Sequence, residues 1–560
     1  IVSPGVFQRE TDQSFITPAP VEVGAAIVGP TVRGPIEQPT VVSSFADYKN
    51  KFGTTFVSAS ENLEFFTSIA VQKFFSNGGN SMLVTRVGSG SFTTATSTNI
   101  SANQGASSGF ASGSLTIATN FVPEDEIQIT VNSNEFRFIA ADPVGGVPAN
   151  NSPLFYFSTG SDIEGTLNFM VAAIDAAGIG VDATDGALAL QLTASLAGTS
   201  GNSITVDTGS GTTFSDVLTL GGGTDGGGDV AFTLKTLAEG TVLNNSTGAT
   251  DDGVQFADGS LKSGSLDNLR YEISGINENN GTFNVSIRRG DDNLNNKIIL
   301  ETFIGCSLDP KADNYIAKVI GDQYAEPTTM EGQTSIRING DYPNQSKFVR
   351  VSSVALQTPD YFLNDGSIGT NSSGNSYTAN LPSAQSGSFH GATGTNIPAD
   401  EALLAFENIS STNTQGLSST DYTTALNILK NKDEYRFATL TLPGVYQSDY
   451  AGAVASAIEL CEVRGDCFYI TDLVPYNSTV ATATSEAGEL NTNFAGTYWP
   501  WVKVPSTELS RNVWAPASTV MQGVYAANDK VAAPWFAPAG LNRGGLPIVR
   551  TEFKVTQALR

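Results

Sequence analysis

The strongest constraint on the fold is an alternation of helix and strand patterns in the last third of the chain. After Asp400, apolar residues at helical spacing alternate with short apolar runs that are typical of buried strands. The expected helices span residues 421–432, 449–463, 479–490 and 516–527, and the expected strands span 437–442, 468–471 and 497–502. This order is typical of βαβ units, which build an open sheet covered by helices. We therefore predict an α/β core domain in this region.

The N-terminal part of the chain carries patterns that fit the same sheet. Residues 23–28 form an apolar run, residues 61–77 repeat apolar residues at helical spacing, and residues 81–87 alternate as a strand. We predict one discontinuous core domain, residues 23–88 plus 346–560, in which N- and C-terminal segments form an open mixed sheet covered by helices.

The middle of the chain differs in composition. A stretch rich in Gly, Ser, Thr and Ala reads as a linker over residues 89–114, and a similar stretch reads as a long loop over residues 364–396. Between them, short alternating runs are typical of β structure. We predict an inserted β-rich peripheral domain at 89–225 and a second inserted β domain at 226–345. The fold class is therefore multidomain α/β + β, with β-rich domains inserted in an α/β core.

Charge is distributed unevenly along the chain. The chain has 55 acidic and 29 basic residues, which gives a net charge of −26. Residues 87–234 hold fourteen acidic residues and one basic residue, Arg137, whereas residues 499–560 hold seven basic and three acidic residues. The acidic excess argues against direct nucleic-acid binding, which depends on Lys and Arg. The opposite charges could meet between neighbouring copies, or the acidic surface could serve solubility alone.

Residues suited to catalysis or metal binding are few. The only histidine, His390, lies in the Gly/Ser-rich stretch and reads as a solvated loop residue; Cys306, Cys461 and Cys467 lack CxxC spacing and read as buried thiols. Asp466 and Asp472 flank the strand predicted at 468–471 and could pair in a hydrolase, although a helix cap is the simpler role. We expect no catalytic residue, no cofactor and no metal site, so the chain is not expected to be an enzyme.

Targeting features point to synthesis in the cytoplasm. No stretch approaches the ~18–20 apolar residues that span a bilayer. The first five residues have neither the basic start nor the apolar run of a secretory signal. The odd number of cysteines argues against a disulfide framework and fits a reducing compartment. We expect no membrane insertion.

The first 22 residues read as an extended arm. They contain three prolines and only scattered apolar residues, so they cannot form a core of their own. Extended segments of this kind donate strands to neighbouring sheets. We predict that the arm connects subunits. The residues expected to make the connection are Pro4, Gly5, Val6, Phe7, Phe15 and Ile16.

Four blocks of sequence, in order, resemble the tail sheath proteins of contractile bacteriophages. They are the opening Ser3-Pro4-Gly5-Val6-Phe7 with Gly34-Pro35, the Phe74-to-Arg86 stretch, Tyr498-Trp-Pro-Trp501, and the stretch from Pro516 to Asp529. The resemblance covers roughly residues 1–90 and 435–560. The core positions that match the family motifs are Gly29, Gly34, Pro35, Phe74, Phe75, Gly78, Gly79, Arg86, Pro516, Gly523, Tyr525 and Asp529.

The resemblance implies a structural subunit that polymerises as stacked hexameric rings around an inner tail tube. Contraction of such a sheath drives the tube through the host cell envelope for genome ejection. The implied partners are other copies of the chain, the tail tube protein, and the baseplate and tail terminator proteins. The implied location is the virion tail, after synthesis in the host cytoplasm. Family members also have a C-terminal domain that faces the tube, which we expect to lie outside this chain.

Two structural alternatives remain open at this point. The same motifs would fit the sheath of a phage-derived bacteriocin or of a secretion device. A surface-layer or adhesin protein would fit the Ser, Thr and Gly content, although such proteins require secretion.

Overall fold

The fold is mixed α/β with many sheets and few helices, which agrees with the predicted class. The computed structural model describes residues 22–557, apart from gaps at 59–60, 103–109, 132–133, 187, 196–198, 209–217, 223–228, 246–254, 257, 372–373, 397–408, 534, 541 and 555. The predicted arm residues Pro4, Gly5, Val6, Phe7, Phe15 and Ile16 lie outside the described residues.

The chain divides into two compact units. Unit 1 comprises Ile1–Ile100, Phe232–Pro359 and Ala384–Arg560. Unit 2 comprises Ser101–Ala231 and Asp360–Ser383. Each unit contains its own sheets and its own hydrophobic core.

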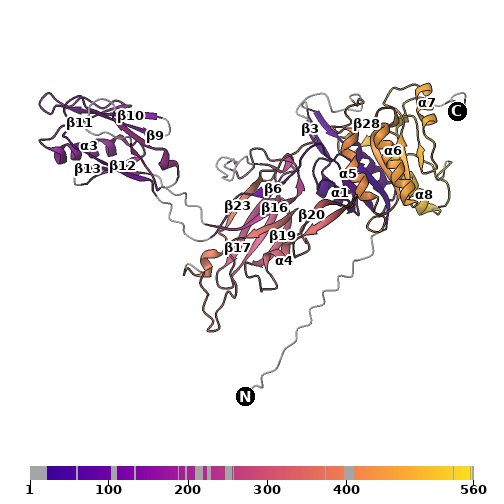
Figure 1. Ribbon diagram of the computed structural model, residues 1–560, viewed down its shortest axis with the longest axis horizontal. Coiled ribbons are helices and arrows are strands. Elements are labelled where there is room, and N and C mark those ends of the chain that lie inside the picture. The colour runs from indigo at the N-terminus through magenta and orange to yellow at the C-terminus, as the bar shows by residue number, and fades with distance from the viewer. Residues whose placement is uncertain are drawn as a thin grey trace, which may run out of the picture. The chain divides into compact units, whose positions relative to one another are not determined.

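Unit 1 contains a six-stranded sheet in the order β2-β5-β1-β24-β25-β26. It lies where indigo N-terminal elements are found among orange C-terminal ones (Figure 1). The strands are β1 (Glu22–Gly29), β2 (Thr40–Val42), β5 (Met82–Arg86), β24 (Arg436–Tyr446), β25 (Phe468–Asp472) and β26 (Ala495–Thr497). Neighbouring strands are parallel except for the antiparallel edge pair β2 and β5. Because β1 pairs with both β5 and β24, strands from the two ends of the chain share one sheet.

Helices cover both faces of this sheet. They are α1 (Phe45–Phe52), α2 (Phe66–Ser76), α5 (Thr423–Leu429), α6 (Gln447–Arg464), α7 (Val480–Glu489) and α8 (Ser518–Val531). Side chains of a strand alternate between faces. In β1, Ala25 and Ile27 pack with residues of α1 and α2, whereas Ala26 and Val28 pack with residues of α5 and α6. Buried strands flanked on both sides explain why β1 and β24 read as continuous apolar runs.

A second sheet of unit 1 has eight strands and curls on itself. Its strands are β6 (Thr94–Ser97), β7 (Ile100–Ser101), β16 (Val230–Glu239), β17 (Leu269–Asn277), β18 (Thr282–Arg289), β19 (Ile299–Ser307), β22 (Val349–Val354) and β23 (Gln385–His390). Phe232 of β16 stacks on Phe283 of β18 with ring centroids 5.5 Å apart, although β17, β23 and β6 separate these strands in the sheet. Helix α4 (Ile316–Ile320) contacts both outer strands, β19 and β22. This sheet therefore contains strands from both predicted insertions, 89–225 and 226–345, and from the second segment of the predicted core, 346–560.

Smaller sheets complete unit 1. They are the pairs β3 (Thr55–Ser58) with β4 (Glu61–Glu64) and β20 (Tyr324–Met330) with β21 (Gln333–Asn339), and the trio β27 (Val502–Ser506), β28 (Arg511–Ala515) and β29 (Arg550–Thr551). The predicted helix over 61–77 is therefore wrong at its start, because residues 61–64 pair with β3 and α2 begins only at Phe66. Phe56 of β3 and Leu63 of β4 pack in a small core with Phe65, which favours the strand.

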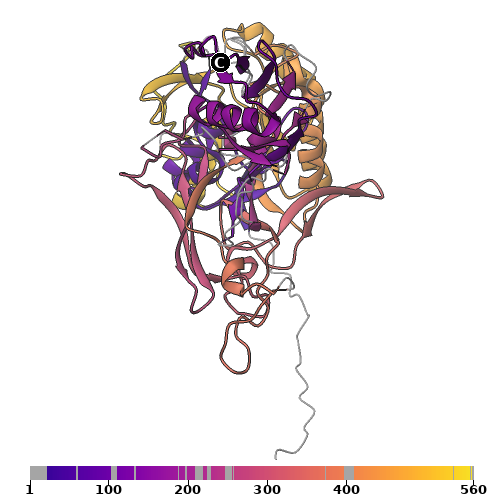
Figure 2. The ribbon, with the colours of Figure 1, turned by 90° about the vertical axis from the view of Figure 1, so that its left-hand side faces the viewer.

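Unit 2 places helix α3 (Ile163–Ala177) against strands of two sheets (Figure 2). The five-stranded sheet has the order β11-β10-β9-β14-β15 and the three-stranded sheet the order β12-β13-β8. The strands are β8 (Ser112–Thr116), β9 (Glu126–Val131), β10 (Asn134–Ala141), β11 (Leu154–Ser158), β12 (Val181–Gly186), β13 (Ala189–Ala194), β14 (Thr205–Thr208) and β15 (Leu218–Thr219). The side chain of Asp162 caps α3 by accepting from Gly165 N at 2.8 Å.

Two stretches predicted as linker or loop contain strands instead. β6, β7 and the start of β8 lie within residues 89–114, and β23 lies within residues 364–396. Strand β23 pairs with both β17 and β6, so it lies inside the sheet. A Cβ atom at Gly387 would overlap the Tyr271 hydroxyl group. Close packing within the sheet therefore requires a glycine at this position, although glycine in the sequence suggested a loop. His390 is therefore the last residue of a strand and not a loop residue.

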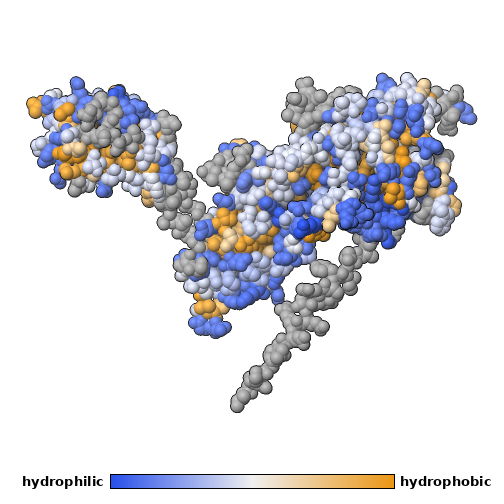
Figure 3. All heavy atoms as spheres, in the orientation of Figure 1, coloured by the Kyte–Doolittle hydropathy of each residue, from blue (hydrophilic) through white to orange (hydrophobic). Residues whose placement is uncertain are grey.

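Apolar side chains also reach the surface of unit 1. Ile304 in β19 is 77% exposed and Met330 in β20 is 71% exposed. Figure 3 shows such hydrophobic residues (orange) among hydrophilic ones on the face that it draws. Within the described ranges, no helix is long and apolar enough to cross a membrane.

Candidate functional site

Some of the motif positions that the sequence analysis took from both ends of the chain meet where α2 packs against α8. Gly523 of α8 lies so close to α2 that a Cβ atom there would be 2.8 Å from the carbonyl oxygen of Lys73. After α2 ends, Gly78 adopts a φ of +97° and lies beside the Lys530 side chain. A Cβ atom at Gly79 would overlap the ring of Phe74. Glycines in these blocks therefore permit close contact between segments that are distant in sequence.

Polar side chains fix α8 and α2 to the surrounding strands. Gln522 of α8 donates its side-chain amide to the carbonyl oxygen of Ala26 in β1 at 2.8 Å. The hydroxyl groups of Tyr525 and Tyr498 lie 2.8 Å apart in a hydrogen bond. The Gln72 side chain of α2 donates to the hydroxyl of Thr507. These three bonds join α2 and α8 to different strands and loops. Together they restrict how the helix pair can shift on the sheet.

Arg86 joins the six-stranded sheet to the eight-stranded sheet. Its side chain is buried, and Nη1 donates to the carbonyl oxygens of Gly34 at 2.6 Å and of Glu239 at 2.7 Å. The guanidinium group also lies 5.0 Å from the ring centroid of Phe92. Burial lowers the pKa of Arg86 to about 9, and the Glu239 carboxylate opposes this shift. Gly34, with a φ of +117°, supplies a turn at which only glycine is unstrained.

A second buried arginine, Arg33, makes a parallel connection that the sequence did not indicate. Its Nη1 donates to the carbonyl oxygen of Asp267 at 2.7 Å, and Nη2 donates to that of Asn50 at 2.9 Å. The Asp267 carboxylate lies 3.9 Å from the guanidinium group. Burial lowers the pKa of Arg33, and Asp267 opposes this shift. The only sequence signal was a basic residue next to the Gly34-Pro35 turn.

Asp472 is a buried carboxylate at the carboxyl end of β25. Its Oδ2 accepts from Ser518 Oγ at 2.6 Å, and its Oδ1 accepts from Ser518 N at 3.1 Å. Burial raises the pKa of Asp472 to about 7, and hydrogen bonds from Ser518 and the backbone of Gly444 oppose this shift. Asp472 therefore stabilises the first turn of α8. The next helix in sequence, α7, has Thr479 as its own N-cap.

Asp466 and Asp472 do not form the acidic pair that a hydrolase would need. They lie at opposite ends of the short strand β25. The side chain of Asp466 accepts from Arg464 Nε at 2.9 Å, whereas Asp472 bonds to Ser518. The pairing considered from the sequence is therefore wrong.

The remaining family positions have separate surroundings. Phe74 and Phe75 make a T-shaped contact with ring centroids 5.3 Å apart. Gly29 packs against Thr67 of α2, and the Pro516 carbonyl oxygen accepts from the Thr519 hydroxyl at 2.7 Å. Pro35 is half-buried, and Asp529 is exposed on α8. Their roles in the family stay a prediction.

The three cysteines are buried free thiols. Cys461 of α6 and Cys467 before β25 have Sγ atoms 3.3 Å apart. Burial raises the pKa of the Cys306 thiol to about 12, which disfavours the reactive thiolate. Among the residues that the structure describes, no group of three or more His, Cys, Asp or Glu side chains could hold a metal ion.

Comparisons with known proteins return similar solved structures, two of which are described here. No protein-family model and no curated protein matches the chain. A sheath tail protein from Listeria innocua is 8% identical with a TM-score of 0.36, and the alignment covers 96% of this chain and 62% of that one. A sheath tail protein from Desulfitobacterium hafniense is 10% identical with a TM-score of 0.33, covering 99% of this chain and 68% of that one. The chain therefore spans 62% of the length of the Listeria protein.

Proposed function

We propose that this chain is a structural subunit of a contractile tail sheath. The observation that carries the proposal is the meeting of sequence motifs from both ends of the chain in one sheet. β1 and β5 bring the N-terminal blocks, β24 lies beside β1, and α8 carries the last block onto α2. Motifs at both ends of the chain would be needed if together they form one core domain, and that domain is repeated in every subunit of the sheath.

The proposed mechanism needs no active site. Subunits assemble as hexameric rings stacked around a tail tube, and contraction moves the tube through the host cell envelope for genome ejection. The work comes from repacking of subunit interfaces between a metastable and a more stable arrangement. A rigid core suits this role, since Arg33 and Arg86 hold two sheets of unit 1 together through backbone carbonyl groups.

The domain layout of the sequence analysis remains part of the proposal. It assigns residues 1–22 to an arm, 23–88 plus 346–560 to the core, and 89–225 and 226–345 to insertions. Proposed partners are other copies, the tail tube protein, and the baseplate and terminator proteins. Nucleic acid and membrane are not proposed partners. The proposed role is not enzymatic, and its proposed place is the virion tail.

Deletion of the arm tests how the subunits connect. The variant lacks residues 1–22 and is otherwise produced from the same gene. We expect a soluble, folded subunit with a nearly unchanged melting temperature, because the deletion removes only the first residue of strand β1, Glu22, and leaves Val23–Gly29 in the sheet. Polymerisation should be lost, because a neighbouring sheet would receive no added strand. Sedimentation and electron microscopy compare the variant with the full chain, and tubes formed as readily without the arm would contradict its role as a connector.

A further inference from the structure

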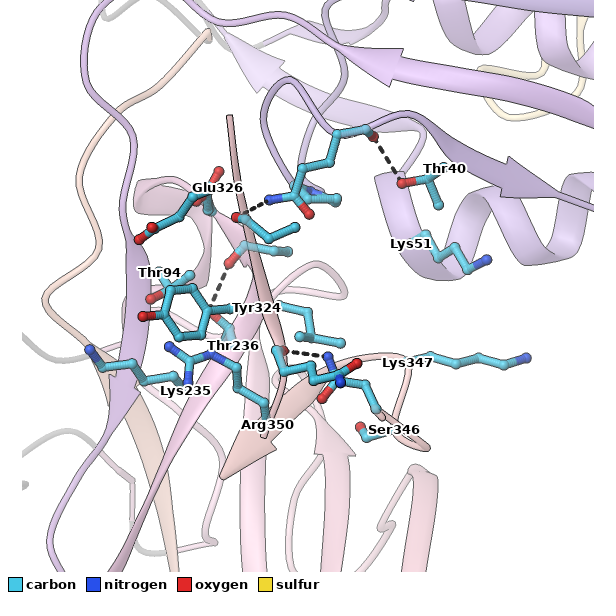
Figure 4. Close-up of a pocket in the computed structure, with 18 of the residues that line it drawn as sticks. Thr40, Lys51, Thr94, Lys235, Thr236, Tyr324, Glu326, Ser346, Lys347 and Arg350 are labelled. Carbon is cyan, nitrogen blue, oxygen red and sulfur yellow. Dashed lines mark hydrogen bonds between the residues drawn. The ribbon is translucent and has the colours of Figure 1, made fainter. Parts of the chain in front are cut away.

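Unit 1 contains an open cavity of about 1150 Å³ that is lined by several basic side chains. The cavity lies between the turn after β1, the end of α1, and strands of the eight-stranded sheet and the β20–β21 pair. Figure 4 shows Lys235, Arg350 and Tyr324 close together, with Lys51 and Lys347 farther along the lining. The acidic residues in the lining are Glu239 and Glu326. This excess of cations is unusual in a chain whose net charge is −26.

Two of the cations face each other across a strand pair. Lys235 of β16 is directly opposite Arg350 of β22 in the antiparallel ladder. Like charges in this arrangement destabilise a sheet. Within the ranges that the structure describes, neither side chain forms an ion pair. Burial lowers the pKa of Arg350, and the nearby Tyr324, Asp322 and Glu326 oppose this shift. An anion in the cavity would relieve the repulsion and the cost of burial.

The Arg350 side chain lies over an aromatic ring in the lining of the cavity. Its guanidinium carbon lies 4.3 Å from the ring centroid of Tyr324, and this stacking holds the guanidinium plane. A planar guanidinium group can donate two parallel hydrogen bonds to one carboxylate. Lys347 is 59% exposed, with Nζ 4.0 Å from Asp47. Lys51, in contrast, already donates to Asp47 and to the carbonyl oxygen of Val41, each at 3.1 Å.

The chain itself supplies a matching anionic surface. Unit 2 contains sixteen acidic residues and one basic residue, Arg137. Some of the acids are exposed in short clusters, such as Asp182 and Asp185 in β12. The cavity has a volume of about 1150 Å³, which leaves room for several side chains of a protein segment.

We propose that this cavity receives an acidic segment of unit 2 from a second copy of the chain. The inference rests on the proposed function, because a sheath brings many copies side by side. Lys235, Arg350 and Lys347 would pair with carboxylates of the neighbour, and Tyr324 would hold the Arg350 guanidinium in place. Such a contact adds a polar, salt-sensitive link between subunits.

A crosslinking experiment on the full chain tests this contact. Equal amounts of ¹⁵N-labelled and unlabelled protein are assembled and treated with a carbodiimide, which joins amines directly to carboxylates. Mass spectrometry should find links between differently labelled chains, from Lys235 or Lys347 to acidic residues of unit 2. High salt should reduce these links. The variant Arg350→Glu should lose most of them, whereas Lys432→Glu, an equal charge change at an exposed residue outside the cavity, should keep them.

Each opposite result would overturn the proposal. Absent links, links within one chain only, or an unchanged yield in folded Arg350→Glu protein would show that the cavity does not hold a neighbour's unit 2. Binding of free citrate or phosphate without any link between chains would assign the site to a small anion instead. Ordered tubes without these links would overturn this contact while leaving the sheath function standing, whereas the absence of any ordered polymer would count against the sheath function itself.

Discussion

Buried ionisable side chains determine how unit 1 holds together at the scale of single residues. Arg33 and Arg86 donate mainly to backbone carbonyl groups. Arg33 donates to α1 and to the residues before β17, and Arg86 donates to the turn after β1 and to the end of β16. Asp472 instead accepts hydrogen bonds from the amide and the hydroxyl group of Ser518 in the first turn of α8. Buried charges are tolerated only where such bonds satisfy them. Substitution of these residues should therefore have large effects on stability.

Replacement of Asp472 by Asn should change the pH dependence of stability. Burial raises the pKa of Asp472 to about 7, whereas an unfolded aspartate titrates near 4. The folded state therefore holds this proton more tightly, and the wild type loses stability as pH rises from about 4 to about 7. The slope is at most about 1.4 kcal/mol per pH unit, and it levels off above the folded pKa. Because Asn cannot ionise, the melting temperature of the Asp472→Asn variant should rise relative to that of the wild type as the pH increases from 5 to 8.

Thermal unfolding of both proteins across this range measures the effect. Asp529→Asn serves as the control, since it also removes a carboxylate of unit 1 but at an exposed position. A difference between Asp472→Asn and the wild type that does not vary with pH would mean that Asp472 does not titrate in this range.

Replacement of Arg86 by Met should destabilise unit 1 by about 2–4 kcal/mol. Met retains apolar volume but leaves the carbonyl oxygens of Gly34 and Glu239 without their donor, and unpaired buried groups cost this much. The control is Arg511→Met, because the Arg511 side chain is 49% exposed and its ion pair with Glu61 spans 3.9 Å. Surface pairs contribute at most about 1 kcal/mol. Equal losses for the two variants in denaturant unfolding would refute the special role of Arg86.

The contact between α2 and α8 is the critical packing at the scale of elements. Both helices lie on one face of the six-stranded sheet, and both contact β24. Gly523 sets their separation, because there is no space for a side chain between it and the Lys73 carbonyl group. Close approach of this kind makes the position sensitive to even one added methyl group.

The change Gly523→Ala should therefore destabilise the protein by about 1–3 kcal/mol through overpacking. The same change at Gly488 in α7 meets no atom within 4 Å and should stabilise slightly, because Ala favours a helix. Denaturant unfolding should show a lower free energy of unfolding for Gly523→Ala than for the wild type, and a slightly higher one for Gly488→Ala. Stabilisation by Gly523→Ala would show that the helices have room to separate.

Sequence patterns predicted the elements that are buried on a regular period. Helices α6 and α8 and strands β1, β24 and β25 were expected close to their observed bounds, because their apolar spacing reflects the layers that cover them. β6 and β23 were missed because, apart from the buried Phe389, most of their residues are small or polar, and their place in the sheet depends on partners such as Tyr271 that are distant in sequence. For the same reason the partners of Arg86 and Arg33 could not be predicted, although Arg86 itself was named by its motif.

Residues 103–228, which make up most of the larger segment of unit 2, are the part of the whole molecule whose removal should leave the rest of the chain folded. The amide of Ala102 donates to the carbonyl oxygen of Asp229 at 2.9 Å, so the two ends of the segment between them lie side by side. Replacing residues 103–228 by two glycines should therefore give a soluble protein that keeps the unfolding transition of unit 1. Circular dichroism and calorimetry measure this result. An insoluble product or a lost transition would show that unit 1 depends on unit 2.

The central claim is that copies of this chain build a helical sheath. Cryo-electron microscopy of particles purified from cells that produce the protein from its own gene tests the claim most directly. We predict striated tubes whose helical reconstruction shows stacked rings of six subunits, with the six-stranded sheet of unit 1 repeated in every subunit. Protein that remains monomeric, or that forms flat lattices or unbranched filaments without sixfold rings, would contradict it.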